Sequence, residues 1–331
     1  MKAGKLPESV LKRSVLRQLH RTDETMAAPG VGCDFSAVSF APGEIVTLST
    51  ETRCLGSAAI GGLGVYAALN NLYCSGARPL GILTNLLLPT SCTEHDLRRE
   101  ISEINRVCEK EQISVLGGHT EVTRAVTEPV LTVTAVGAVP QRECIYPDMV
   151  QPGMDLVVTK WIALEGTAVL AIQREEELLS RFTRPFLDRA KQFAQYLSIR
   201  SEAAVAVKSG AAAMHDISEG GIFGALWEMG QREGVGLEID LKKIPIRQES
   251  IEICEFFDMN PYKLVSGGSL LIAAEDGNAL VRALEQEGIS SVVIGKVTDS
   301  NDRVLLNGEE RRFLETTQTD ELWKLDVTVH G

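Results

Sequence analysis

The feature that most restricts the fold is a repeated switch between the hydrophobic period of a strand and that of a helix. Between residues 43 and 139, apolar residues recur first at every second position and then at every third or fourth. The pattern predicts strands at 45–49, 80–88 and 129–139, and helices at 64–75 and 93–110. We therefore expect the first half of the chain to form a mixed α+β unit.

Two local features refine this first unit. Thr93 stands directly before the second helix, with Asp96 three positions on, as expected of a helix cap. Residues 6–19 have the spacing of a short helix behind a charged arm that could be mobile. A short strand, "ISVLGG" (113–118), is expected to lead into His119.

A second α+β unit is expected after a linker. "YPDMVQPGMD" (146–155) places two prolines and a glycine between apolar runs, so we place the boundary near residue 150, with domains at 1–150 and 151–331. In the second domain the pattern predicts strands at 155–160, 236–241, 269–274 and 292–297, with helices at 184–197 and 278–287.

Composition excludes several classes of protein. With 44% apolar and 24% charged residues, the 331-residue chain is too apolar to be disordered. A net charge of −12 with scattered Lys and Arg argues against a nucleic-acid partner, although it leaves nucleotide binding open. Seven cysteines without a C-x-x-C pair suggest reduced thiols. No apolar stretch is long enough to span a bilayer, so we expect a cytoplasmic protein that does not use a membrane.

Glycines at the start of the first long helix form one candidate site. Gly61, Gly62 and Gly64 stand where a strand leads into a helix, so backbone N–H groups there could approach a phosphate. The segment matches neither a Walker A loop nor G-x-G-x-x-G. Glycines at such junctions more often serve turn geometry or close packing.

Polar residues at the ends of predicted strands or helices form a second candidate site. They are Asp34, Glu51, Asn71, His119 and Glu121. Oxygen ligands from several loops would suit Mg²⁺ that bridges phosphates. Solvated loop ends explain the same pattern, and composition alone favours that interpretation.

The segment "MHDISEGGIFGALWEM" supplies a third candidate site in the second half. A polar turn between a strand and a helix is a plausible edge for phosphate or metal. Its polar and glycine residues are His215, Asp216, Ser218, Glu219, Gly220 and Gly221. Ser218 could equally be a simple helix cap.

The order of these motifs resembles that of the AIR-synthase-like ATP-binding superfamily. The likeness covers nearly the whole chain and is closest to its HypE hydrogenase-maturation branch. The segments that carry it are "GCDFSAV", "STET", "LNNLYCSGARPLGI", "GGHTEV", "HDISEGGIFGALWEM", "MNPYKLVSGGSLLIA" and "IGKVTD". The family glycines and polar residues that the resemblance adds to the nucleotide site fall on Asn70, Gly118 and Thr120.

The resemblance implies a two-domain α+β fold and an ATP-binding role. The N-terminal mixed sheet would pair with a second copy into a barrel within a homodimer, and the C-terminal domain would be an α/β sandwich. ATP and Mg²⁺ would lie in a cleft roofed by the N-terminal domain. Lys5, in the arm, is a possible phosphate contact.

The sequence departs from the family at the predicted metal site. Asp34 is kept, Glu51 is one carbon longer than the family aspartate, and two further carboxylates are replaced by Asn71 and His119. Because Mg²⁺ prefers anionic oxygen, its binding should be weaker. We expect His119 to be a site residue that coordinates a softer metal, donates to a phosphate or acts as an acid or base, with Glu121 as the replacement carboxylate.

A second departure concerns the thiol that HypE carries on its terminal cysteine. The sequence ends in "ELWKLDVTVHG", and its last cysteine is Cys254. We therefore expect the HypE reaction in its known form to be absent. Cys254 stands in the apolar segment "IEICEFF", which is more typical of packed core than of a substitute carrier.

The leading functional hypothesis is an ATP-dependent enzyme that phosphorylates an amide or carboxyl-type oxygen of an unknown small-molecule or protein-bound substrate. Asp34, Glu51, Asn71 and Asp216 would hold Mg²⁺, the glycines would line the phosphates, and His119 with Glu121 would position the reacting oxygen. The alternatives are a small-molecule kinase of the thiamine-monophosphate type and a non-catalytic nucleotide-binding homologue.

Overall fold

The computed structural model describes residues 4–5, 8–20, 22, 25–27, 37–38, 40–54, 60–316 and 319–325 of the chain. The chain divides into two compact units. The first comprises residues 1–73 and 77–144, and the second comprises residues 74–76 and 145–331. Each unit has its own sheet and its own buried side chains.

A five-stranded mixed sheet organises the first unit. Its strands run in the order β1-β6-β5-β7-β4, with β5 and β6 parallel and the other neighbours antiparallel. The elements of this unit are β1 (Gly4–Lys5), α1 (Glu8–Ser14), η1 (Leu16–Gln18), β2 (Thr25–Ala27), β3 (Ala37–Val38), β4 (Glu44–Arg53), α2 (Ile60–Tyr73), β5 (Arg78–Pro89), α3 (Glu94–Glu111), β6 (Ser114–Thr123), β7 (Val130–Pro140) and η2 (Gln141–Glu143).

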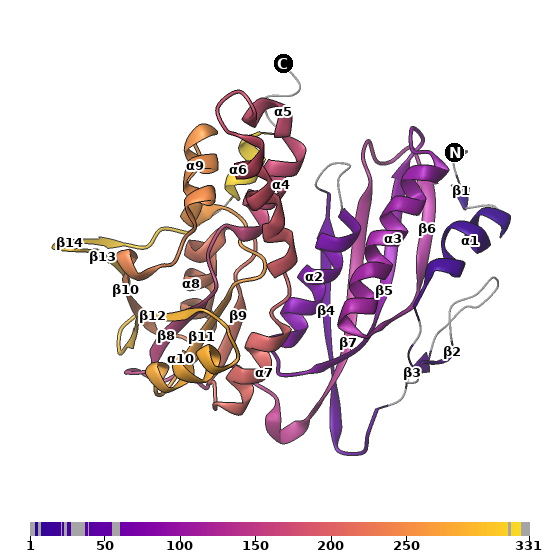
Figure 1. Ribbon diagram of the computed structural model, residues 1–331. Coiled ribbons are helices and arrows are strands. Elements are labelled where there is room, and N and C mark those ends of the chain that lie inside the picture. Colours follow the sequence, from indigo (N-terminus) through magenta and orange to yellow (C-terminus); the bar gives the residue numbers. More distant parts are fainter. Residues whose placement is uncertain are drawn as a thin grey trace. The chain divides into compact units, whose positions relative to one another are not determined.

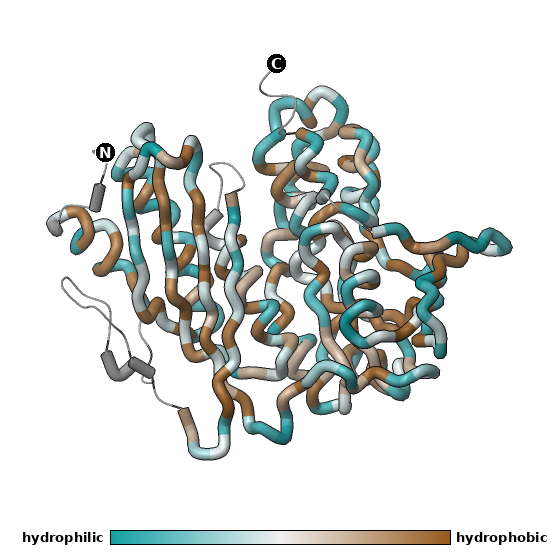
Figure 2. Tube along the Cα trace, turned by 180° about the vertical axis from the view of Figure 1, so that it is seen from behind, coloured by the Kyte–Doolittle hydropathy of each residue, from teal (hydrophilic) through white to brown (hydrophobic). Residues whose placement is uncertain are grey.

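Helices α2 and α3 cover one face of this sheet (Figure 1). Alternate residues of β7 face these helices and are buried, including Leu131, Val133 and Ala135. Seen from behind in Figure 2, the strands of this sheet show alternating brown and teal stretches, and the face away from the helices carries exposed apolar side chains. Leu48 is 69% exposed there and Val46 is 43% exposed. The sheet therefore has one face packed on helices and one open, partly apolar face.

Most predicted elements are confirmed, but three extend further than the sequence pattern indicated. Helix α2 begins at Ile60 rather than residue 64, so its glycines lie in the helix and not in a link. Strand β4 continues past Glu51. Strand β6 continues through His119, so this residue lies within a strand and not in a turn. In each case tertiary pairing overrides the local glycine or polar pattern.

The second unit is built on a seven-stranded sheet in the order β14-β13-β10-β12-β8-β11-β9. Its strands are β8 (Asp155–Thr159), β9 (Ala213–Asp216), β10 (Gly236–Asp240), β11 (Leu270–Ala274), β12 (Ser291–Thr298), β13 (Arg303–Asn307) and β14 (Glu310–Phe313). Its helices are α4 (Leu164–Gln173), α5 (Glu175–Leu178), α6 (Arg184–Lys191), η3 (Gln192–Tyr196), α7 (Arg200–Lys208), α8 (Gly221–Arg232), η4 (Leu241–Lys243), α9 (Gln248–Phe256), η5 (Pro261–Lys263), α10 (Gly277–Gln286) and η6 (Glu321–Lys324).

Strands β8 and β11 are neighbouring interior strands of this second sheet. All five residues of each strand are buried, in keeping with the wholly apolar sequence of β11 and the apolar centre of β8 between Asp155 and Thr159. A continuous core surrounds them, with Leu156, Val158 and Leu271 among its members. Within the described part of the chain, no helix combines the length and the apolar character needed to cross a bilayer.

Candidate active site

An acid–amide pair lies beneath α2 in the first unit. Alternation along β4 turns Glu51 toward the helix-covered face, opposite Val133 of β7. Helix α2 follows β4 and packs back on it, which places Asn71 over the strand. The side-chain amide of Asn71 donates a hydrogen bond of 2.6 Å to Oε1 of Glu51. Two residues predicted to be metal ligands are thus in direct contact.

His119 and Glu121 form a second pair on strand β6. They are two residues apart and therefore lie on the same side of the strand. Nε2 of His119 is 3.1 Å from Oε2 of Glu121, and the two side chains are 44% and 38% exposed. This geometry suits a solvated acid–base pair whose donor and acceptor roles depend on the histidine tautomer.

The two pairs lie on opposite faces of one sheet. His119 is opposite Asn85, Asn85 is opposite Thr132, and Thr132 is opposite Thr52, so these residues share the open face. Glu51 is the neighbour of Thr52 and faces the other way. Strands β4 and β6 are also separated by β7 and β5, which corresponds to about 14 Å. Within one copy of the chain, the two pairs cannot act on the same substrate atom.

The glycines of α2 make close packing contacts. A side chain at Gly61 would place its first carbon 2.6 Å from the backbone oxygen of Glu100 in α3. At Gly64 the same atom would be 3.0 Å from Leu131 of β7. The backbone N–H of Gly61 donates to the buried carboxylate of Glu100 at 3.1 Å, and burial raises the pKa of Glu100. The Gly61 N–H, which was predicted to contact phosphate, thus already donates its hydrogen bond to a carboxylate of the same chain.

The glycine turn before α8 has a similar arrangement. Gly220 and Gly221 both have positive φ, at 81° and 60°. The N–H of Gly220 donates to Oδ2 of Asp320 at 2.7 Å. Asp320 is only 5% exposed, and burial raises its pKa to about 6. The chain therefore supplies its own anion at this helix terminus.

Other candidate residues fall within regular elements. Asp216 is the buried last residue of β9 in the second unit, and the preceding His215 lies 2.8 Å from Glu228. Asn70 is buried in α2. On β6, Thr120 is half-buried. Gly118 allows close strand pairing, because an added side-chain carbon would lie 2.0 Å from the oxygen of Thr84.

Asp34, Lys5 and Cys254 complete the predicted residues. Asp34 lies outside the described residues. Lys5 belongs to β1, where the register sets it opposite Glu121. Cys254 is 1% exposed, and burial raises the pKa of its thiol to about 12, which confirms its interpretation as core.

Sequence reasoning missed the two carboxylates that bind the glycine amides. Glu100 had a detectable signal, because it lies three residues after Leu97 and four before Ile104 on the apolar face of α3. Asp320 had none, because a hundred residues separate it from Gly220.

No group of three or more His, Cys, Asp or Glu side chains arranged to hold a metal occurs among the described residues. Glu51 and Asn71 nevertheless fit part of a Mg²⁺ site. In sites that bind nucleotides, one or two protein oxygens act together with substrate phosphates and water. An asparagine amide can also turn its oxygen toward a cation.

The fold and these pairs define a class: a two-unit mixed α/β protein whose first sheet carries polar pairs on both faces. Residues 32–139 match the N-terminal domain of AIR synthase related proteins, and residues 151–306 match their C-terminal domain. The chain belongs to the AIR synthase related protein family, as the motif order predicted.

Relatives with HypE-type names match across most of the chain. A putative hydrogenase expression/formation protein of Methanocaldococcus jannaschii is 25% identical over 315 residues, covering 92% of this chain and 91% of its own. The carbamoyl dehydratase HypE of Rhodobacter capsulatus is 26% identical over 285 residues, covering 84% and 79%. A crystal structure of HypE in complex with ATP matches with a TM-score of 0.78 at 16% identity and covers 95% of both chains. That structural match confirms the two-domain fold.

Proposed function

We propose that this chain is an ATP-dependent enzyme that activates an amide or carboxyl-type oxygen by phosphorylation. The observation that carries the proposal is the contact between Glu51 and Asn71, in a chain whose fold matches ATP-bound HypE along 95% of its length. The carbamoyl dehydratase name of a relative supports an amide-type oxygen as acceptor. The acceptor oxygen belongs to a small molecule or to a group carried by a protein.

In this proposal the helix-covered face holds the nucleotide phosphates. Glu51 supplies an anionic oxygen and Asn71 a neutral one, so together with the phosphates they would bind Mg²⁺ less tightly than two carboxylates. Mg²⁺, when bound, would neutralise charge on the transferred phosphoryl group. Asp34 and Asp216 remain predicted further ligands.

The open face has a different role in the proposal. Its exposed leucine and valine side chains suit a second copy of the chain, as in a homodimer. His119 and Glu121 lie on this face and would then look toward the partner. We propose them as an acid–base pair of this face, separate from the metal ligands of the same copy, because an oxygen that accepts the phosphoryl group must lie beside the phosphates on the covered face.

The test is ADP formation by the purified chain with ATP, Mg²⁺ and a panel of carbamoyl and carboxamide compounds. Turnover that depends on the acceptor and releases free phosphate supports activation of an oxygen. A stable phosphorylated product would indicate a small-molecule kinase instead. Binding without turnover across the panel would indicate a non-catalytic homologue.

A variant of His119 separates the two roles. His119→Ala should lower turnover at least tenfold and leave ATP affinity within about twofold, because the side chain lies on the face opposite Glu51. Glu51→Ala should instead weaken ATP binding. If His119→Ala weakens ATP binding as strongly as Glu51→Ala, the division between the two faces is wrong.

A further inference from the structure

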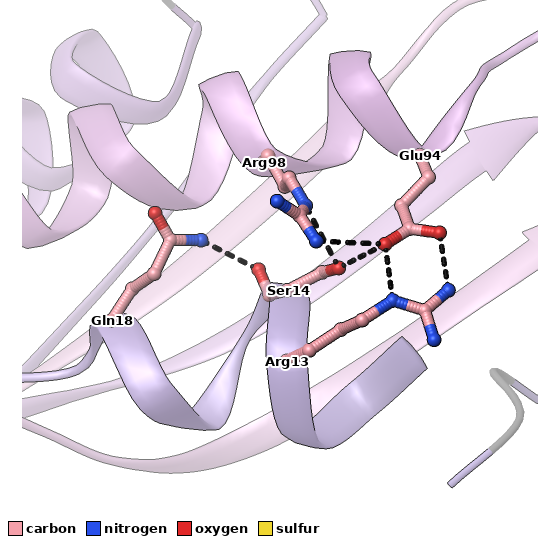
Figure 3. Close-up of polar contacts among 5 residues, drawn as sticks. All are labelled: Arg13, Ser14, Gln18, Glu94 and Arg98. Carbon is pink, nitrogen blue, oxygen red and sulfur yellow. Dashed lines mark hydrogen bonds and ion pairs between the residues drawn. The ribbon is translucent and has the colours of Figure 1, made fainter. Parts of the chain in front are cut away.

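The N-terminal arm docks on helix α3 through one carboxylate (Figure 3). Arg13, near the end of α1, donates from Nε and Nη2 to the two oxygens of Glu94 at 2.7 and 2.6 Å. This is a bidentate pair, which fixes orientation as well as distance. The partners are 81 residues apart in the sequence, so the contact is tertiary.

The same carboxylate receives further donors. Ser14, which is fully buried, donates its hydroxyl to Oε1 of Glu94 at 2.7 Å. Arg98, one turn along α3, donates to the same oxygen at 3.2 Å and to the Ser14 hydroxyl at 3.2 Å. Gln18 donates to the backbone oxygen of Ser14 at 2.6 Å. The bond to Arg13, followed by that to Ser14, lowers the pKa of Glu94 to about 2.

Contacts on both sides of this anchor tie the arm to the sheet. Downstream, the N–H of His20 donates to Asn105 of α3 at 2.6 Å, and the N–H of Thr22 donates to Ser114 of β6 at 2.7 Å. Upstream, β1 pairs with β6, with Gly4 opposite Val122 and Lys5 opposite Glu121. Without β1, strand β6 would be the edge of the sheet, and its backbone groups would be open to solvent.

We propose that Glu94 is a positioning residue that holds the N-terminal arm as the outer strand beside the His119–Glu121 pair. A two-residue strand has too few hydrogen bonds to stay paired by itself, so its register depends on the anchor at Arg13, in the helix that follows. The anchored arm keeps Lys5 of β1 in register with Glu121 of β6. This inference rests on the proposed function where it concerns turnover.

The experiment combines hydrogen exchange of the full-length chain with calorimetry and the ADP-formation assay. The variants are Glu94→Gln and Arg13→Ala, each of which breaks the bidentate pair. The matched control is Glu103→Gln, because Glu103 lies on the same helix and pairs with Arg106 rather than with the arm. The probe ligand is a non-hydrolysable ATP analogue with Mg²⁺.

The expected result is at least tenfold faster exchange of the backbone amides at residues 4–14 and 121–122 in both variants. Exchange in α3 should stay unchanged. The double variant should exchange no faster than either single one, because both remove the same contact. Acceptor-dependent ADP formation should fall at least threefold with Glu94→Gln, recover in part with Glu94→Asp and stay unchanged in the control, while nucleotide affinity stays within about twofold in every variant because the arm lies beside the open face and not beside Glu51.

Unchanged exchange in the Glu94→Gln variant would overturn the inference. Faster exchange with full acceptor-dependent turnover would overturn its link to the His119–Glu121 pair. If the wild-type chain binds no nucleotide, the proposed function fails, and the anchoring role is then decided by the exchange data alone.

Discussion

Asn71 donates a 2.6 Å hydrogen bond to Glu51, and this contact joins helix α2 to strand β4 on the covered face of the first sheet. In the family resemblance, both positions correspond to carboxylates. Replacing one acid by an amide turns a repulsive pair into a hydrogen-bonded one. The pair is therefore stable without a cation, and its affinity for Mg²⁺ should be lower than that of two acids.

Asn71→Asp should lower stability in the absence of metal and raise affinity for Mg²⁺. Two carboxylates in contact repel, so the free energy of unfolding without metal should fall by about 1–2 kcal/mol. Mg²⁺ should recover that loss and strengthen ATP binding at least tenfold relative to the metal-free variant. Thermal melts and calorimetry with and without Mg²⁺ measure both effects. Asn85→Asp, on the open face, is the control and should show neither.

Adjacent glycines in α2 should respond in opposite directions to alanine. At Gly61 the added carbon would meet the backbone of Glu100 at 2.6 Å, so Gly61→Ala should lower the free energy of unfolding by about 1–3 kcal/mol. At Gly62 the nearest atoms are side-chain ends at 3.5 Å, so Gly62→Ala should raise it by up to about 1 kcal/mol. Equal effects in denaturant titrations would contradict the packing explanation.

Stability of the second unit should depend on pH through Asp320. Its pKa is raised to about 6 from an ordinary value of 3.8, because burial disfavours the carboxylate. The folded state then binds the proton more tightly than the unfolded state between these values. The free energy of unfolding should fall by about 3 kcal/mol as the pH rises from 4 to above 6.

The measurement is urea unfolding followed by tryptophan fluorescence, because all three tryptophans lie in the second unit. Asp320→Asn should flatten the pH dependence. Asp276→Asn, which changes an exposed cap of α10, should keep the wild-type slope. An unchanged slope in Asp320→Asn would show that another group is responsible.

The open face should mediate self-association. Leu48 is 69% exposed on β4, and a charge there would be buried in any interface over this face. Leu48→Glu should convert a dimer to a monomer in analytical ultracentrifugation. Ile172→Glu, at an exposed apolar position of the second unit, should leave the mass unchanged. A wild-type chain that sediments as a monomer at micromolar concentration would contradict the dimer.

Much of the fold could be predicted from the sequence because its signals are local. The apolar spacing of α3 and its Thr93 cap are both present, with the reciprocal bonds of a capping box. The segment 129–139 likewise predicted a strand, and β7 is found there with alternate residues buried along its first half.

The site was harder to predict because its geometry depends on register and tertiary contacts. His119 follows two glycines, which suggests a turn, yet pairing with β5 keeps it in a strand. The face that His119 occupies is set by a register irregularity between Ile82 and Leu83. The carboxylate of Asp320, far along the chain, also gave no local sign that it would bind Gly220.

The most direct test of the central claim is calorimetric titration with a non-hydrolysable ATP analogue, with and without Mg²⁺, of the wild-type chain and Glu51→Ala. We predict binding to the wild-type chain that strengthens with Mg²⁺ and weakens at least tenfold in the variant. No binding under any condition, or equal binding by both proteins, would contradict a nucleotide site at the Glu51–Asn71 pair.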